Sequence, residues 1–105
     1  MSMLQHYQSW LEKKPGDRLA MYGVALELKK AGQTDAAREA FEALLAVHPH
    51  SGAGWFQYGA LFEEAGEEEL AVATWQRGLE ALADSTDAEA KRSMSEIRTA
   101  LAALE

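Results

Sequence analysis

Apolar and small side chains recur along this chain with a period of about 34 residues. When residues 52–85 are laid over residues 18–51, apolar and small positions coincide, with one glycine on a glycine and two aromatic residues on aromatic residues. The clearest matched pairs are Ala31 with Ala65, Gly32 with Gly66, Ala37 with Ala71, Phe41 with Trp75, Leu45 with Leu79 and Tyr22 with Phe56. Because a fixed period of this length is typical of stacked supersecondary units, it predicts a repeat protein rather than a single closed core.

Each copy contains two stretches in which apolar residues follow helical spacing. The first copy predicts helices over about 17–31 and 34–48, and the second predicts them over about 51–65 and 67–83. A glycine stops the first helix of each copy. The residues expected to cap helix N-termini are Ser2 (with Gln5 in a capping box), Asp17, Thr34 and Thr86 (with Glu89 in a capping box).

The two ends of the chain extend this pattern in different ways. Leu11 and Pro15 lie one period before Leu45 and Pro49, so residues 1–15 are expected to be the second half of an incomplete repeat. The last segment does not keep the period of a third repeat. It carries one apolar stripe on a predicted helix, formed by Ala90, Met94, Ile97, Leu101 and Leu104. A closing amphipathic helix that covers the last unit is the simpler interpretation.

The order of residue types within each copy resembles the tetratricopeptide repeat, whose pattern is Trp-x2-Leu-Gly-x2-Tyr, then Ala-x3-Phe, then Pro. The matching residues are Trp55, Tyr58, Gly59, Phe62, Ala71 and Trp75 in the second copy, and Met21, Val24, Ala25, Leu28, Ala37, Phe41 and Pro49 in the first. The departures are Met21 for a large aromatic residue, Gly78 for alanine and Ala83 for proline.

The resemblance covers roughly residues 4–83. It implies an all-α fold, an antiparallel helix-pair solenoid formed by a single domain over 1–105. The expected parts are a half repeat (1–15), two full repeats (18–51 and 52–85) and a capping helix (86–105).

Composition and charge narrow the range of partners. The chain is 48% hydrophobic and 26% charged, which is ordinary for a folded protein. Its formal net charge of −7 argues against binding to nucleic acid or to an anionic membrane, because both depend on Lys and Arg. The absence of cysteine excludes disulfides and thiolate zinc sites. No leader-like or membrane-spanning stretch is evident, so a cytoplasmic location is expected.

No motif predicts catalysis or cofactor binding. The three histidines are His6, His48 and His50, and the last two flank a proline in an expected turn without carboxylates at metal-ligand spacing. Gly52 and Gly54 lack the strand, third glycine and lysine of a phosphate loop. We therefore expect a protein that is not an enzyme and that has no metal and no cofactor.

A second face of the first helix in each repeat is the candidate binding surface. In the family that the chain resembles, this face lines a concave groove that receives peptides. The residues predicted to line it are Leu19, Tyr22, Leu26, Lys29, Lys30, Ala53, Phe56, Gln57, Ala60, Glu63 and Glu64. Tyr22 and Phe56 either face the groove or pack on each other between units. Some members of the family grip a C-terminal carboxylate with Lys and Asn along this face, but here those places hold Tyr22, Leu26, Phe56 and Ala60, so this binding mode is not expected.

The charges at the ends of these helices allow two interpretations. Lys29 and Lys30 occupy the places that Glu63 and Glu64 hold one repeat later. The glutamates either pair with lysines of the adjacent unit or form an acidic rim that selects a basic segment. The predicted function is a protein-interaction adaptor, monomeric or weakly self-associating, that binds a protein or peptide. The alternative is a structural or self-associating subunit of a larger assembly.

Overall fold

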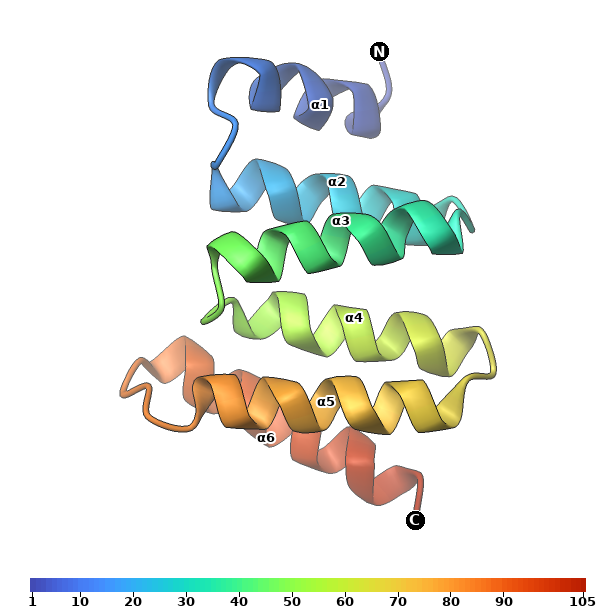
Figure 1. Cartoon of the computed structure of the whole chain (residues 1–105), viewed down its shortest axis with the longest axis vertical. Coiled ribbons are helices and arrows are strands. Elements are labelled where there is room, and N and C mark those ends of the chain that lie inside the picture. The colour runs from blue at the N-terminus through green and yellow to red at the C-terminus, as the bar shows by residue number, and fades with distance from the viewer. The chain divides into compact units, whose positions relative to one another are not determined.

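The computed structural model describes all residues from 1 to 105, and they form six α-helices without any β-strand (Figure 1). The helices are α1 (Met3–Lys13), α2 (Arg18–Lys30), α3 (Thr34–Val47), α4 (Gly52–Glu64), α5 (Glu68–Leu82) and α6 (Ala88–Ala103). Contacts divide the chain into two compact units, residues 1–48 and residues 49–105. The expected single domain stays a prediction, and each unit is described by itself.

The repeat period is reproduced in the helix boundaries. Helix α4 begins and ends one period after α2, and α5 begins one period after α3. The same turn closes α2 and α4, with Gly32 at φ 75° and Gly66 at φ 77°, a conformation that glycine adopts without steric cost. The amide of the next residue then donates to the carbonyl of Leu28 at 3.0 Å in the first unit and to that of Phe62 at 2.8 Å in the second.

The first unit consists of a helix hairpin with one additional helix packed on it. Helices α2 and α3 run antiparallel, and α1 packs against α2 (Figure 1). The ring of Tyr7 on α1 lies over Gly23 of α2, in the space that a Cβ of Gly23 would occupy. The buried apolar residues of this unit are Ala20, Ala25, Leu28, Ala37, Phe41, Leu44 and Leu45. They come from α2 and α3, which together form the core of the unit.

The second unit is a three-helix unit in which α6 packs against both members of the α4–α5 hairpin. The hairpin core is built on a reciprocal fit between tryptophan and glycine. The indole of Trp75 on α5 lies over Gly59 of α4, and the side chain of Trp55 on α4 lies over Gly78 of α5. Both indole N–H groups are satisfied, since Trp75 donates to the Phe56 carbonyl (3.1 Å) and Trp55 to the Pro49 carbonyl (2.8 Å).

Two of the four predicted N-caps are confirmed. Ser2 and Gln5 form the predicted capping box of α1, and the Asp17 carboxylate accepts from the amide of Ala20 at 3.0 Å. Ser51, which was not predicted as a cap, accepts from the amide of Gly54 at 3.2 Å.

The caps predicted at Thr34 and Thr86 are wrong. Helix α3 begins directly at Thr34. The residue before it, Gln33, takes the N-cap position, and its backbone carbonyl accepts the first hydrogen bond of the helix, from the amide of Ala37. Helix α6 is capped by Asp87, whose carboxylate accepts from the amide of Glu89 at 3.2 Å. Asp generally caps helices better than Thr, which agrees with this choice.

Candidate partner-binding site

Phe56 is the aromatic side chain of α4 that the core does not fully cover. The helix directs Trp55, Tyr58 and Phe62 into the core, where each is at most 4% exposed. Phe56 follows Trp55 in sequence and therefore points about 100° away around the helix. Its ring is half-buried and stacks on Trp75 with centroids 6.3 Å apart and planes inclined by 20°. This contact and the hydrogen bond of Trp75 to the Phe56 carbonyl fix the position of the ring.

A pocket of about 430 Å³ lies between α4 and α6, and Phe56 forms part of its wall. Both helices belong to the second unit. The lining residues are Phe56 and Glu63 from α4 and Ser95, Glu96, Thr99, Ala100 and Ala103 from α6. The pocket is open to solvent and largely apolar, with two carboxylates among its lining groups.

The packed face of α6 explains how this helix forms one side of the pocket. The buried residues of α6 match those of α4 when the two helices are aligned at one residue more than the repeat period. The matched pairs are Trp55 with Ala90, Tyr58 with Ser93, Gly59 with Met94 and Phe62 with Ile97. The helix therefore repeats the burial pattern of α4 with one extra residue in the period. Ser93 fits against Gly52 of α4, where a Cβ would overlap its side chain.

The polar groups of the pocket are mostly acceptors that remain available to a ligand. Glu63 and Glu96 are exposed, and neither carboxylate is in an ion pair. The Thr99 hydroxyl donates to the Ser95 carbonyl of its own helix at 3.0 Å, so its proton is already used. The electrostatic character of the pocket is therefore set by the two carboxylates.

The other predicted groove residues of the second unit lie on the same helix but outside the pocket. Ala53, Gln57 and Ala60 are half-buried, and Glu64 is exposed at the end of α4. The contribution of α6 was not predicted, because the sequence was compared only at the repeat period. A comparison at a separation one residue longer aligns the packed residues of α6 with those of α4.

The predicted groove residues of the first unit lie along α2. Tyr22, Leu26 and Lys29 are half-buried, whereas Leu19 is 57% exposed. Lys30 is exposed and pairs with Glu27 of its own helix at 3.4 Å. Burial raises the pKa of the Tyr22 phenol above 10.0, because desolvation disfavours the phenolate. That Tyr22 and Phe56 share one surface stays a prediction.

His48 has a structural role. The Nε2–H of His48, at the end of α3, donates to the Gly16 carbonyl at 2.7 Å. This bond ties the end of α3 to the turn before α2. No group of three or more His, Asp or Glu residues is arranged to hold a metal ion.

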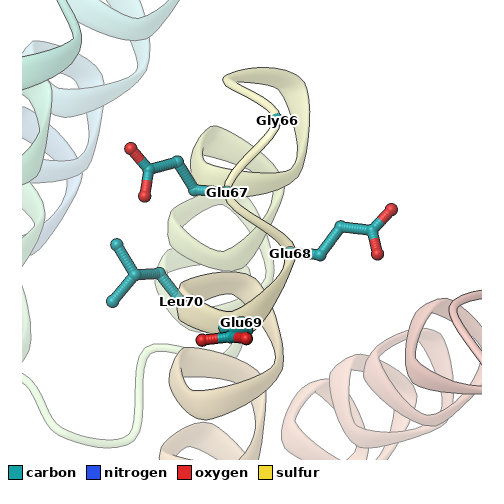
Figure 2. A pocket seen from close by; sticks show the side chains of 5 residues that line it. All are labelled: Gly66, Glu67, Glu68, Glu69 and Leu70. Atoms are coloured by element: carbon teal, nitrogen blue, oxygen red, sulfur yellow. The ribbon is translucent and has the colours of Figure 1, made fainter.

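A larger hollow, about 680 Å³ in volume, lies at the start of α5 and is lined by three glutamates with Gly66 and Leu70. Figure 2 shows that the side chains of Glu67 and Glu68 point in opposite directions. Because the carboxylates do not converge on a common point, they do not form a binding site. Negative charge in the first turn of α5 instead stabilises the N-terminus of the helix.

Residues 20–61, which cover most of α2, all of α3 and most of α4, match the family model for the tetratricopeptide repeat. This stretch is therefore similar to the tetratricopeptide repeat, which supports the resemblance predicted from the sequence. The predicted fold class, an all-α protein of antiparallel helix pairs of the solenoid type, is confirmed by this match together with the six helices. No curated protein matches the chain. None of its helices has the length and apolar character needed to cross a bilayer.

Proposed function

We propose that the chain is a non-enzymatic module that binds a segment of a partner protein in the pocket between α4 and α6. Tetratricopeptide repeats generally mediate protein–protein interaction, and the family is typically non-enzymatic. The observation that carries the proposal is the half-buried Phe56, held by Trp75 at the wall of this pocket. A rigid aromatic side chain at a solvent-open hollow is the kind of group on which binding energy concentrates.

The size and lining of the pocket suit one or two side chains of a peptide. Its volume of about 430 Å³ lies within the range of small-ligand sites, and its apolar lining would bury an aliphatic or aromatic side chain. The pocket is open to solvent, so the peptide backbone can continue beyond it. An amphipathic helix or an extended segment with one apolar anchor satisfies these conditions.

Tyr22 is proposed as a second anchor in the first unit. It occupies the position on α2 that Phe56 occupies on α4, and it is likewise half-buried. The exposed Leu19 lies beside it on α2, one turn earlier. A Tyr22→Ala variant that weakens partner binding would support this second anchor, and unchanged binding would restrict the site to the second unit.

A peptide selection tests the proposal directly. A random library of short peptides is displayed on phage and selected against the immobilised full chain. Selected peptides are then measured on the unmodified chain, on Phe56→Ala and on Val47→Ala. Val47 on α3 is 54% exposed and lies outside the pocket, so it is a matched control for loss of apolar surface.

We expect Phe56→Ala to weaken binding by about 1–2 kcal/mol or more, as aromatic anchors often do. The Val47→Ala chain should bind as the unmodified chain does. Circular dichroism of Phe56→Ala must show a folded chain, since the variant also loses the stacking on Trp75. Peptides that bind both variants equally well would contradict the proposal.

Self-association is the second candidate function. The large apolar side chains with the highest exposure are Met1, Met3, Leu19 and Val47, and all four lie in the first unit. An apolar surface of this kind could contact a second copy. Sedimentation equilibrium over a concentration series distinguishes the two functions. A monomer at all concentrations would exclude self-association, and a dimer that dissociates in Leu19→Ser or Val47→Ser would support it.

A further inference from the structure

The geometry points to a basic partner: we infer that the α4–α6 pocket selects segments in which an apolar side chain has Lys or Arg two or four positions away. This inference rests on the proposed function and specifies the chemistry of the partner. It is carried by the two carboxylates of Glu63 and Glu96, which come from different helices and line the same apolar pocket as Phe56.

The two carboxylates are available to a ligand. Both glutamates are exposed, and neither is in an ion pair with a Lys or Arg of the chain. Helix α6 does carry the exposed cations Lys91, Arg92 and Arg98, but none of them lines the pocket. The pocket therefore presents negative charge to a peptide, and the net charge of −7 for the whole chain adds to it.

Charge complementarity separates the three classes of segment that could enter. An acidic segment would place like charges beside Glu63 and Glu96, which disfavours its binding. A neutral segment would bury its apolar anchor against Phe56 but would gain nothing from the carboxylates. A segment that carries both an apolar and a basic residue gains the burial against Phe56 and the attraction of the carboxylates. Long-range attraction would also raise its association rate.

The distance between Phe56 and Glu63 along α4 limits the spacing between the apolar and basic residues of a bound peptide. Glu63 lies two helical turns after Phe56 on α4, a rise of about 10 Å along the helix axis. An extended peptide covers this length in about three residues, at about 3.3 Å per residue. Side chains of an extended peptide alternate between its two faces, so a residue two or four positions from an apolar residue over Phe56 shares its face and can place a long basic side chain beside Glu63.

The test uses the phage library peptides that depend on Phe56. Their affinities are measured on the unmodified chain, on the double variant Glu63→Gln, Glu96→Gln, and on the control Glu12→Gln, Glu80→Gln. The control removes the same amount of charge from exposed positions outside the pocket. Glutamine preserves the size of glutamate, so the folds should be unaffected.

We expect the Phe56-dependent peptides to carry Lys or Arg two or four positions from an apolar residue. The pocket variant should bind them about tenfold more weakly, and the control should bind them nearly as well as the unmodified chain. The difference should shrink at about 1 M salt, where the screening length falls to about 3 Å. Replacing the basic residue of the peptide with glutamine should remove the effect of the pocket variant.

Two results would overturn the inference, and they are distinguishable. Phe56-dependent peptides that lack basic residues and bind the pocket variant equally well would exclude a basic partner but leave the proposed function standing. A selection that yields no Phe56-dependent peptide would remove the proposed function and the inference with it.

Discussion

The indole of Trp75 occupies the space that a Cβ of Gly59 would need. Trp55 and Gly78 repeat this relationship in the opposite direction between the same two helices, α4 and α5. A large ring is thereby accommodated wherever the facing helix has no side chain. This reciprocal arrangement lets the helices approach closely while their tryptophans fill the core.

The first prediction follows from this fit. A Gly59→Ala substitution forces the Trp75 ring, which is 1% exposed, to move in a packed core. It should lower the free energy of unfolding by about 1–3 kcal/mol, measured by urea denaturation. Gly16→Ala is the matched control, because nothing lies within 4 Å of a Cβ at that position. The control should change stability by less than about 0.5 kcal/mol. Equal effects of the two substitutions would contradict the described packing.

The repeat period accounts for how much of the fold was predictable. Because Gly32 and Gly66 end their helices in the same turn, the period places both helix hairpins correctly. The position of Gly59 in that period also indicates a close helix contact. Local signals were less reliable at the caps, where Asp87 rather than Thr86 takes the N-cap position.

The candidate site was only partly predictable, because it depends on contacts between distant segments. Phe56 and Glu63 were identified from their place on the predicted groove face. Glu96 and the other α6 residues were not, since a single extra residue shifts that helix out of the repeat period. How far α6 would close over α4, and hence the presence of a pocket, is a matter of tertiary packing that helix periodicity does not encode.

A second prediction concerns the buried tryptophan itself. Trp75→Ala removes a side chain that is 1% exposed and should cost about 3–5 kcal/mol of unfolding free energy. Trp10→Ala on α1 should cost less, because Trp10 is only half-buried and the helix has no fully buried residue. Chemical denaturation followed by circular dichroism measures both. A small loss for Trp75→Ala would mean that this side chain does not hold the core as described.

A third prediction addresses the closing helix. Ile97 of α6 is fully buried, so Ile97→Ala should cost about 2–5 kcal/mol. Ending the chain after Ala83 removes α6 entirely and exposes the apolar surface that it covers, so aggregation or a large stability loss is expected. A chain that ends after Ala103 is the control. If the chain ending at Ala83 stayed monomeric with an unchanged melting midpoint, α6 would not be a structural cap.

The fourth prediction is the pH dependence contributed by Tyr22. Burial raises the pKa of its phenol above 10.0 in the folded chain, so the neutral form is favoured by folding. The resulting stability is fully present below the pKa of the unfolded chain and is lost as the pH rises through the folded pKa. Tyr22→Phe should therefore lose less stability than the unmodified chain between about pH 9 and 11. Parallel curves for the two proteins would show that Tyr22 is not desolvated.

The most direct test of the central claim is to map a bound peptide by NMR. A Phe56-dependent peptide from the selection is added to the isotope-labelled full chain, and amide shifts are followed. We expect saturable shifts centred on Phe56 and Glu63 of α4 and on Ser95, Glu96 and Thr99 of α6, all of which line the pocket. Shifts confined to surfaces away from these two helices would contradict the claim that the α4–α6 pocket binds the partner.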